Sequence, residues 1–153
     1  MPHGFDGQGP EHSSSRVERF LQLSDTSDVP VLTSEFDTYT NVNIQIVNCS
    51  TAANYFHVLR RQLLRPFRKP LVVVAPKKLL KLREAGSDIE EFTKGHTFQR
   101  VIGETNRDIN PANVRKLVLC SGQVYYDLIA EREKLGKKDI AIVRVEQLSP
   151  FPY

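Results

Sequence analysis

Residues 44–76 decide the fold, and they read IQIVNCSTAANYFHVLRRQLLRPFRKPLVVVAP. The stretch opens with the alternating run 44–48, which predicts a strand, and Ser50-Thr51 then supply a helix cap. It closes with the β-branched run 70–76, bracketed by prolines, which predicts a parallel strand buried on both faces. Strand, helix and strand in succession form one βαβ unit with a right-handed crossover.

The helix of this unit is predicted to be amphipathic. It must end near Pro66, because proline cannot continue a helix. Its apolar side chains recur at helical spacing, so the sequence predicts that one face packs in the core: Ala52, Tyr55, Phe56, Leu59 and Leu63.

A second βαβ unit follows closer to the end of the sequence. Residues 114–120 predict a strand, Ser121-Gly122 a turn, and the residues after them an amphipathic helix that Gly136 ends. Residues 139–145 (DIAIVRV) predict the next strand. Each half of the chain therefore supplies two strands, whereas a doubly wound sheet needs about five to bury its faces.

The stretch between the two units has no strong hydrophobic period. It contains Gly95, Gly103 and Asn110-Pro111, which are typical of a linker. The predicted fold class is therefore α/β, with parts of two doubly wound parallel-sheet domains. The predicted boundaries are 1–85 for the end of the first domain, 86–111 for the linker and 112–153 for the start of a truncated second domain.

The N-terminal residues 2–15 read PHGFDGQGPEHSSS and lack any hydrophobic period. Their glycines allow tight turns and a close approach to a ligand, and two imidazoles suit proton transfer or anion binding. The alternative is an ordinary flexible terminus. Residues 15–18 (SRVE) match a capping box, so we expect a helix to begin there with Val17, Phe20 and Leu21 on its apolar face.

Composition excludes several classes of protein. The chain is 40% hydrophobic and 25% charged, as expected of a folded domain, and no apolar run is long enough for a membrane span. The start does not resemble a signal or transit peptide. Cys49 and Cys120 lack metal-ligand or disulfide spacing and are predicted to be free thiols, and the four histidines are too scattered for a metal site.

Positive charge is concentrated between Arg60 and Arg83, where nine Lys and Arg side chains occur without a carboxylate. The whole chain carries only +3, so its remainder is acidic, which argues against nucleic acid as a partner. A local anion pocket, a domain interface and a solvated surface all remain open for this segment.

Five ordered stretches resemble the thiamine-diphosphate-dependent first component of 2-oxoglutarate dehydrogenases, mitochondrial type. They are PHGFDGQGPEHSSSRVERFLQL (2–23), NCSTAANYFHVLRRQLLRPFRKPLVVVAPKKLL (48–80), HTFQRVIGE (96–104), CSGQVYYDL (120–128) and IAIVRVEQLSPFPY (140–153). The resemblance implies a transketolase-like three-layer αβα architecture. Where relatives usually read PKSLLRHP, this chain reads PKKLLKLR (76–83); the lost serine, histidine and proline argue against a conserved anion site there, and we assign no regulator.

The resemblance also implies roles for the N-terminal residues. His3 corresponds to a family histidine near the substrate, where it binds a carboxylate or relays a proton, and His12 resembles a histidine that contacts substrate oxygens. Both are expected to be catalytic, and their structural alternative is to hold a backbone carbonyl. Gln8 and Glu11 are expected to bind the substrate or support the histidines.

The implied reaction is oxidative decarboxylation of 2-oxoglutarate in the tricarboxylic acid cycle. The implied cofactors are thiamine diphosphate and Mg, with their main binding motifs outside this chain. The implied partners are a lipoyl-bearing succinyltransferase and a second copy in a homodimer, and the implied location is the mitochondrial matrix.

Three functional hypotheses remain. The first is a fragment of the enzyme that is inactive alone. The second is a non-catalytic interaction module of the same complex, and the third is a small anion-binding α/β protein.

Overall fold

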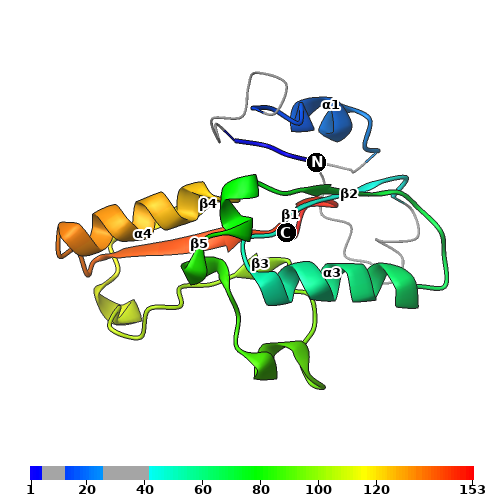
Figure 1. The fold of residues 1–153 in the computed structure, drawn as a ribbon. Coiled ribbons are helices and arrows are strands. Elements are labelled where there is room, and N and C mark those ends of the chain that lie inside the picture. The colour runs from blue at the N-terminus through cyan, green and yellow to red at the C-terminus, as the bar shows by residue number, and fades with distance from the viewer. Residues whose placement is uncertain (5–12, 26–41) are drawn as a thin grey trace.

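A computed structural model describes residues 1–4, 13–25 and 42–153 (Figure 1). The α-helices are α1 (Val17–Gln22), α3 (Ala52–Leu64) and α4 (Val124–Lys134). The strands are β1 (Gln45–Asn48), β2 (Leu71–Val74), β3 (Val101–Ile102), β4 (Lys116–Cys120), β5 (Ile140–Val145) and β6 (Gln147–Ser149). Short 3-10 helices connect them: η2 (Lys77–Leu80), η3 (Arg83–Ala85), η4 (Ile89–Phe92) and η5 (Pro111–Asn113).

The first predicted βαβ unit is confirmed. β1 and β2 pair in parallel, with Gln45 opposite Leu71, and α3 connects them. Thr51 caps α3, because its side chain accepts a hydrogen bond from the backbone N–H of Asn54. β1 is fully buried, whereas most of β2 is only half-buried, so the expectation of a strand buried on both faces holds for β1 rather than β2.

The second predicted unit is confirmed as well. β4 and β5 pair in parallel, with Leu117 opposite Ala141, and α4 connects them. Gly136, which follows the C-cap Leu135 of α4, has a φ of +59°, a conformation that favours glycine and ends the helix. α4 lies along this sheet at the far end of the molecule from the C-terminal end of α3 (Figure 1).

Both sheets also contain an antiparallel strand, so each is mixed rather than purely parallel. The strand orders are β2-β1-β6 and β3-β5-β4, in which β6 pairs with β1 and β3 pairs with β5. The α/β class is confirmed, but the sequence patterns do not predict these two short strands. Runs of two or three residues are too short to show a period of two.

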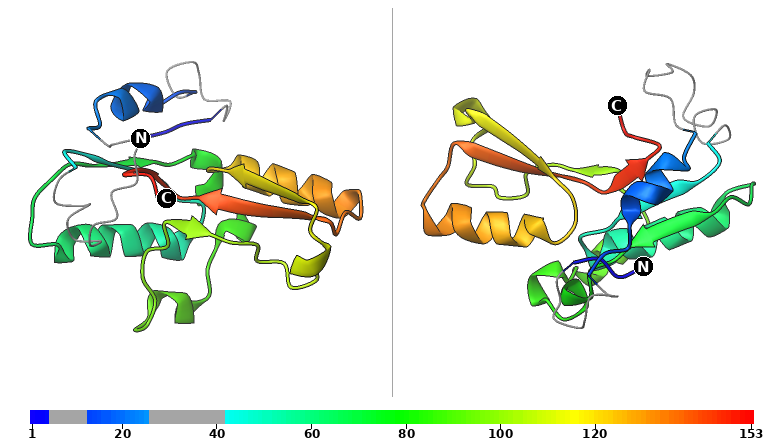
Figure 2. Two further views of the ribbon diagram at one scale, coloured as in Figure 1. Left: turned by 180° about the vertical axis from the view of Figure 1, so that it is seen from behind. Right: turned by 90° about the horizontal axis from the view of Figure 1, so that it is seen from above.

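The chain passes directly from one sheet to the other at Glu146. β5 ends at Val145 and β6 begins at Gln147, so the two sheets share one continuous segment. Two views from other sides show this segment running out of the β4-β5 pair toward β1 (Figure 2). The last described strand of the second half therefore completes the sheet of the first half.

α3 buries a different face from the predicted one. Tyr55, Phe56, Leu59 and Leu63 are exposed, Leu63 to 78%, and the buried residues are Ala53, Asn54, His57 and Val58. Polar contacts decide this orientation. The Asn54 amide bonds the backbone of Gln99, with both contacts at 3.0 Å or less, and His57 bonds the Glu91 carbonyl. The segment after η3 therefore covers α3 through polar contacts, and the spacing of apolar residues along the sequence does not predict such contacts.

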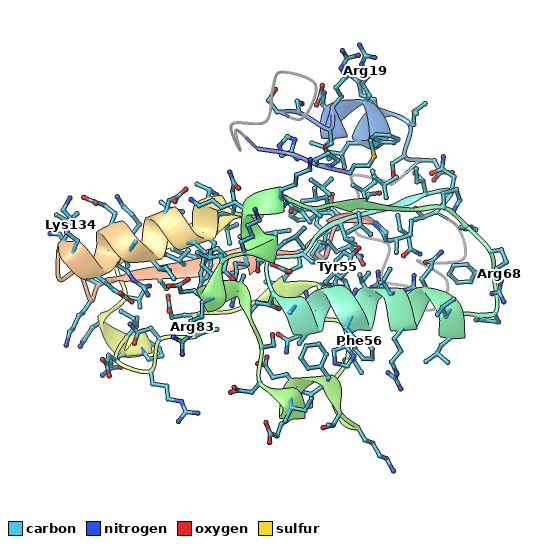
Figure 3. The ribbon with its side chains drawn as sticks, in the orientation of Figure 1. Arg19, Tyr55, Phe56, Arg68, Arg83 and Lys134 are labelled. Carbon is cyan, nitrogen blue, oxygen red and sulfur yellow. The ribbon has the colours of Figure 1, made fainter. Side chains whose placement is uncertain are left out.

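The predicted apolar residues of α3 still make contacts at the edge of the buried region. The Phe56 ring meets the Phe92 ring of η4 edge-on, with centroids 5.5 Å apart, on the η4 side of α3 (Figure 3). The interior itself forms two clusters, one around Val47 and Val58 and one around Tyr126 and Ile142. In the described part of the chain, every helix is too short or too polar to cross a membrane.

α1 begins at Val17, but the predicted capping box is wrong. Arg16 is the residue before the helix, its φ is +52°, and its side chain makes no cap. Ser15 Oγ, the atom that would cap the helix, lies 3.3 Å from His3 Nδ1 instead. The predicted apolar face of α1 is not buried either, since α1 has no buried residue.

Candidate functional site

The first residues lie at the carboxyl end of β2. The backbone N–H of Ala75, just beyond β2, donates to the carbonyl of Met1 over 2.9 Å. Gly4 has a φ of +123° and packs so closely on Gln123 that an added Cβ would lie 2.8 Å from Gln123 Nε2. His3 is therefore held between the end of the first parallel pair and the turn that follows β4.

The side chain of His3 is held by the start of α1. The backbone N–H of Ser15 donates to His3 Nδ1 over 3.2 Å, and Ser15 Oγ lies 3.3 Å from the same nitrogen. The backbone N–H of Gly4 donates to the Ser13 carbonyl over 3.0 Å. These contacts set residues 3–4 beside residues 13–15.

The other predicted site residues, His12, Gln8 and Glu11, lie outside the described residues, and their roles remain predictions.

Polar side chains that the sequence patterns did not single out lie at the carboxyl ends of β1 and β4, where Gln123 is next to Gly4 and Asn48 is next to Gly122. Asn48 ends β1, and Ser121 and Gln123 follow β4. Asn48 Oδ1, Ser121 Oγ and Gln123 Oε1 are buried and have no hydrogen-bond partner among the described residues. Ligands of parallel sheets bind beyond the carboxyl ends of the strands, which is where these atoms lie. The available signal was that polar residues stand at the end of one predicted strand and just after another.

Gly122 brings the two strand ends together. Its φ is +69°, and an added Cβ would lie 2.6 Å from Asn48 Nδ2. Only glycine permits this approach without a shift of the Asn48 amide. The turn after β4 therefore packs directly on the end of β1.

A buried polar network lies behind these strand ends. Glu146 is fully buried and accepts hydrogen bonds from the backbone N–H of Ser50 over 2.8 Å and from Asn54 Nδ2 over 2.9 Å. Tyr126 Oη donates to the Ser50 carbonyl over 2.7 Å. Burial raises the pKa of Glu146, although these hydrogen bonds and the nearby Arg144 charge oppose the rise.

Arg144 completes this network. Its Nη1 donates to Ser50 Oγ over 3.1 Å, and its guanidinium group lies 4.1 Å from the centre of the Tyr125 ring. Burial also raises the pKa of Tyr126 to about 12, against the opposing charge of Arg144. The network joins residues from both halves of the chain and serves to hold them together.

A cavity of about 180 Å³ lies beside the start of α3. Its lining includes Thr51, Asn54, His57, Gln99 and Arg144. This volume is below the several hundred Å³ of typical cofactor sites. His57 Nε2 is already bonded to the Glu91 carbonyl over 2.7 Å, which gives this histidine a structural role.

Three cations of the basic segment make contacts with other parts of the fold. Arg61 donates to Gln147 over 2.8 Å, and Arg65 donates to Gln45 over 2.5 Å, so both cations stabilise buried glutamines of the first sheet. Lys78 pairs with Asp127 of α4 at 3.3 Å. These contacts favour the interpretation of the segment as an interface between the parts of the fold.

The two cysteines are not poised for nucleophilic chemistry. Both are free thiols, Cys49 buried and Cys120 half-buried. Burial raises the pKa of each thiol, so neither is held as the reactive thiolate.

Comparison with known families divides the chain into two matches. Residues 1–83 match the model of the transketolase pyrimidine-binding domain. Residues 86–153 match the model of the 2-oxoglutarate dehydrogenase C-terminal region.

Individual relatives match along the whole chain. The 2-oxoglutarate dehydrogenase of Caenorhabditis briggsae, named as mitochondrial, is 51% identical over 162 residues, which cover 100% of this chain. A mitochondrial 2-oxoglutarate dehydrogenase-like protein of Rattus norvegicus is 52% identical over 159 residues. The 2-oxoadipate dehydrogenase complex component E1 of Homo sapiens is 50% identical over 154 residues. The chain spans about 16% of the length of each of these relatives.

Proposed function

The chain belongs to the transketolase pyrimidine-binding domain family, and on this premise we propose that it is part of a thiamine-diphosphate-dependent 2-oxoglutarate dehydrogenase. The observation that carries the proposal is the placement of His3. Its neighbours Met1 and Gly4 contact the carboxyl end of β2 and the turn after β4, and Ser15 holds its imidazole. This is the edge of a parallel sheet at which α/β proteins bind their ligands.

We propose that His3 and His12 contact the 2-oxo acid, and that Gln8 and Glu11 bind it or support the two histidines. His3 is half-buried, so its imidazole is partly shielded from water. A positioned imidazole of this kind can bind a carboxylate or assist a proton transfer.

We retain the division into residues 1–85, 86–111 and 112–153 as a proposal. The two family matches, which meet between residues 83 and 86, support the first boundary. The second boundary rests on the βαβ unit that begins with β4. The pairing of β6 with β1 indicates that the two proposed domains pack as one unit.

The family is one of thiamine diphosphate proteins, and this cofactor supplies the electron sink for decarboxylation when bound. The described residues do not fit its metal-bound diphosphate. Among them, no group of three or more His, Cys, Asp or Glu side chains could hold a metal ion. The partnerless atoms of Asn48, Ser121 and Gln123 are neutral. We therefore assign the diphosphate and Mg to residues other than the described ones.

The proposed partners are 2-oxoglutarate, a lipoyl-bearing succinyltransferase and a second copy of the full-length protein. The proposed location is the mitochondrial matrix, supported by relatives whose names include "mitochondrial". A second candidate substrate is 2-oxoadipate, because a dehydrogenase component named for it is nearly as similar as those named for 2-oxoglutarate.

A chimaera tests this function. The matching segment of a full-length relative is replaced by this chain, and carbon dioxide release is measured with 2-oxoglutarate and with 2-oxoadipate. We expect turnover with a preference for 2-oxoglutarate, whereas the opposite preference supports the second candidate. His3→Ala in the chimaera should lower kcat by about 100-fold or more. A chimaera that folds and binds thiamine diphosphate but turns over neither acid contradicts the proposal.

A further inference from the structure

The contact between Ser15 and His3 determines which ring nitrogen of His3 carries the proton. A backbone N–H can only donate, so the Ser15 amide requires a lone pair on His3 Nδ1. In a neutral imidazole, the nitrogen that does not accept is the one that bears hydrogen. The amide contact therefore assigns the proton of neutral His3 to Nε2, and Ser15 Oγ, 3.3 Å from Nδ1, can then only donate to that nitrogen.

We propose that Ser15 is a positioning residue that presents His3 Nε2–H as a hydrogen-bond donor to an oxygen atom of the 2-oxo acid. This inference rests on the proposed function, and it adds the direction of the hydrogen bond. Nε2 has no hydrogen-bond partner among the described residues. The acceptor is a carboxylate oxygen, or a carbonyl oxygen that gains negative charge during the reaction.

The same geometry decides between the two roles that the resemblance implies for His3. An Nε2 that already bears hydrogen has no lone pair with which to accept a substrate proton. A charged ring would need a hydrogen on Nδ1, which would face the Ser15 N–H and break that bond. His3 therefore binds and orients an oxygen rather than relaying a proton.

The backbone around Ser15 is built to keep this contact. Ser15 is only 7% exposed. Next to it, the hydrogen bond between the Gly4 N–H and the Ser13 carbonyl holds residues 3–4 beside residues 13–15. The sequence predicts Ser15 as the cap of α1, but Arg16 occupies that position in the structure. The contact with His3 is the interaction that Ser15 makes instead.

Nuclear magnetic resonance of the intact 15N-labelled chain tests the tautomer without any assay of activity. Long-range 1H–15N correlations above neutral pH distinguish Nε2–H from Nδ1–H, and loss of the signals in His3→Gln assigns them. We expect only the Nε2–H tautomer for His3. We also expect a scalar coupling across the hydrogen bond between the Ser15 amide nitrogen and His3 Nδ1.

Three variants locate the cause. Ser15→Ala keeps the backbone N–H and should keep the single tautomer, whereas Ser15→Pro removes it and should populate both tautomers. Ser14→Pro is the matched control, because it places a proline next door and keeps the Ser15 N–H. A dominant Nδ1–H form, a missing coupling in the unmodified chain, or an unchanged tautomer in Ser15→Pro overturns the proposal. If Ser15→Pro does not fold, the coupling decides alone.

The donor role is tested in the chimaera described above. A glutamine amide nitrogen can reach the place of Nε2, whereas an asparagine amide reaches only that of Nδ1. We expect His3→Gln to keep kcat/KM within about tenfold and His3→Asn to lose about 100-fold, the scale of one lost donor. Equal losses in both variants overturn the donor role. An unmodified chimaera that binds the cofactor without turnover counts against the proposed function instead.

Discussion

Glu146 and Ser50 stand 96 residues apart in the sequence and form a buried hydrogen-bonded pair. Ser50 lies between β1 and α3, and Glu146 lies between β5 and β6, so the pair joins the two sheets at the point where the chain crosses between them. The same carboxylate also bonds Asn54, the residue that attaches α3 to the backbone of Gln99. One acidic side chain thus ties the first sheet, α3 and the second half together.

The first prediction concerns the pH dependence that Glu146 imposes. Its pKa is raised in the folded state by burial, so the folded protein binds its proton more tightly than the unfolded chain. This contribution to stability is fully present below the unfolded value of about 4.5 and is lost as pH rises through the folded value. Glu146→Gln cannot titrate, so its stability relative to the unmodified chain should rise with pH above about 4.5.

Urea unfolding of both chains between about pH 4 and pH 8 measures this difference. Leu63→Ala, at an exposed position without a titrating group, is the control and should run parallel to the unmodified chain. If the Glu146→Gln curve also runs parallel, the carboxyl group does not titrate as proposed.

The second prediction concerns the ion pair of Arg132 and Glu104, which lies under α4. Arg132 Nη1 is 2.5 Å from Glu104 Oε2, and the two side chains are 4% and 15% exposed. Arg132→Met leaves the Glu104 carboxylate largely buried without its cation. We expect the free energy of unfolding to fall by about 3 kcal/mol at neutral pH.

The pH dependence of this pair has the opposite sign to that of Glu146. Burial alone would raise the pKa of Glu104, but hydrogen bonds from Arg132 and from the Ile142 and Asn106 amides lower it. The stabilisation is therefore present above the unfolded value and is lost as pH falls through the lowered folded value. Lys134→Ala, which breaks an exposed pair with Glu131, should cost about 0.5 kcal/mol or less. If Arg132→Met and Lys134→Ala lower the free energy of unfolding equally, the Arg132–Glu104 pair does not stabilise the fold as a buried ion pair.

The third prediction separates backbone strain from crowding at two glycines. Gly122 and Gly136 have similar positive φ values of +69° and +59°, but only Gly122 has a neighbour within van der Waals reach. Gly136→Ala should cost about 1 kcal/mol, the penalty for a left-handed residue with a side chain. Gly122→Ala should cost about 2–3 kcal/mol, because its Cβ must also displace the Asn48 amide. Chemical denaturation of both variants measures the difference, and equal costs would show that Asn48 moves freely.

The fourth prediction tests which face of α3 is in the core. Val58 is fully buried, and Leu63 is 78% exposed although it lies on the predicted apolar face. Val58→Ala should lower the free energy of unfolding of this chain by about 2 kcal/mol, and Leu63→Ala should change it by about 0.5 kcal/mol or less. A larger loss at Leu63 than at Val58 would restore the orientation that the sequence predicts.

The local sequence was sufficient to predict both βαβ units. The β-branched run of β2, the alternation in β1 and the glycine after α4 act through neighbouring residues, so their signals survive in a short window. The glycine-rich N-terminal segment already marked His3 as a candidate, its role came from the family resemblance, and its position near the end of β2 was not deducible from composition. The polar atoms of Asn48, Ser121 and Gln123 were not selected, because nothing in a short window reports that two strand ends meet.

The sequence by itself determined the longer strands and helices of the two βαβ units, since helical and strand periods, caps and prolines act over a few residues. Only the tertiary structure decided three further features. Asn54 and His57 face inward on α3, and β6 pairs with β1 in the first sheet. Ser15 bonds His3 and does not cap α1. In each case a buried polar group needed a hydrogen-bond partner far along the chain, and the cost of leaving that group unpaired outweighed the local preference.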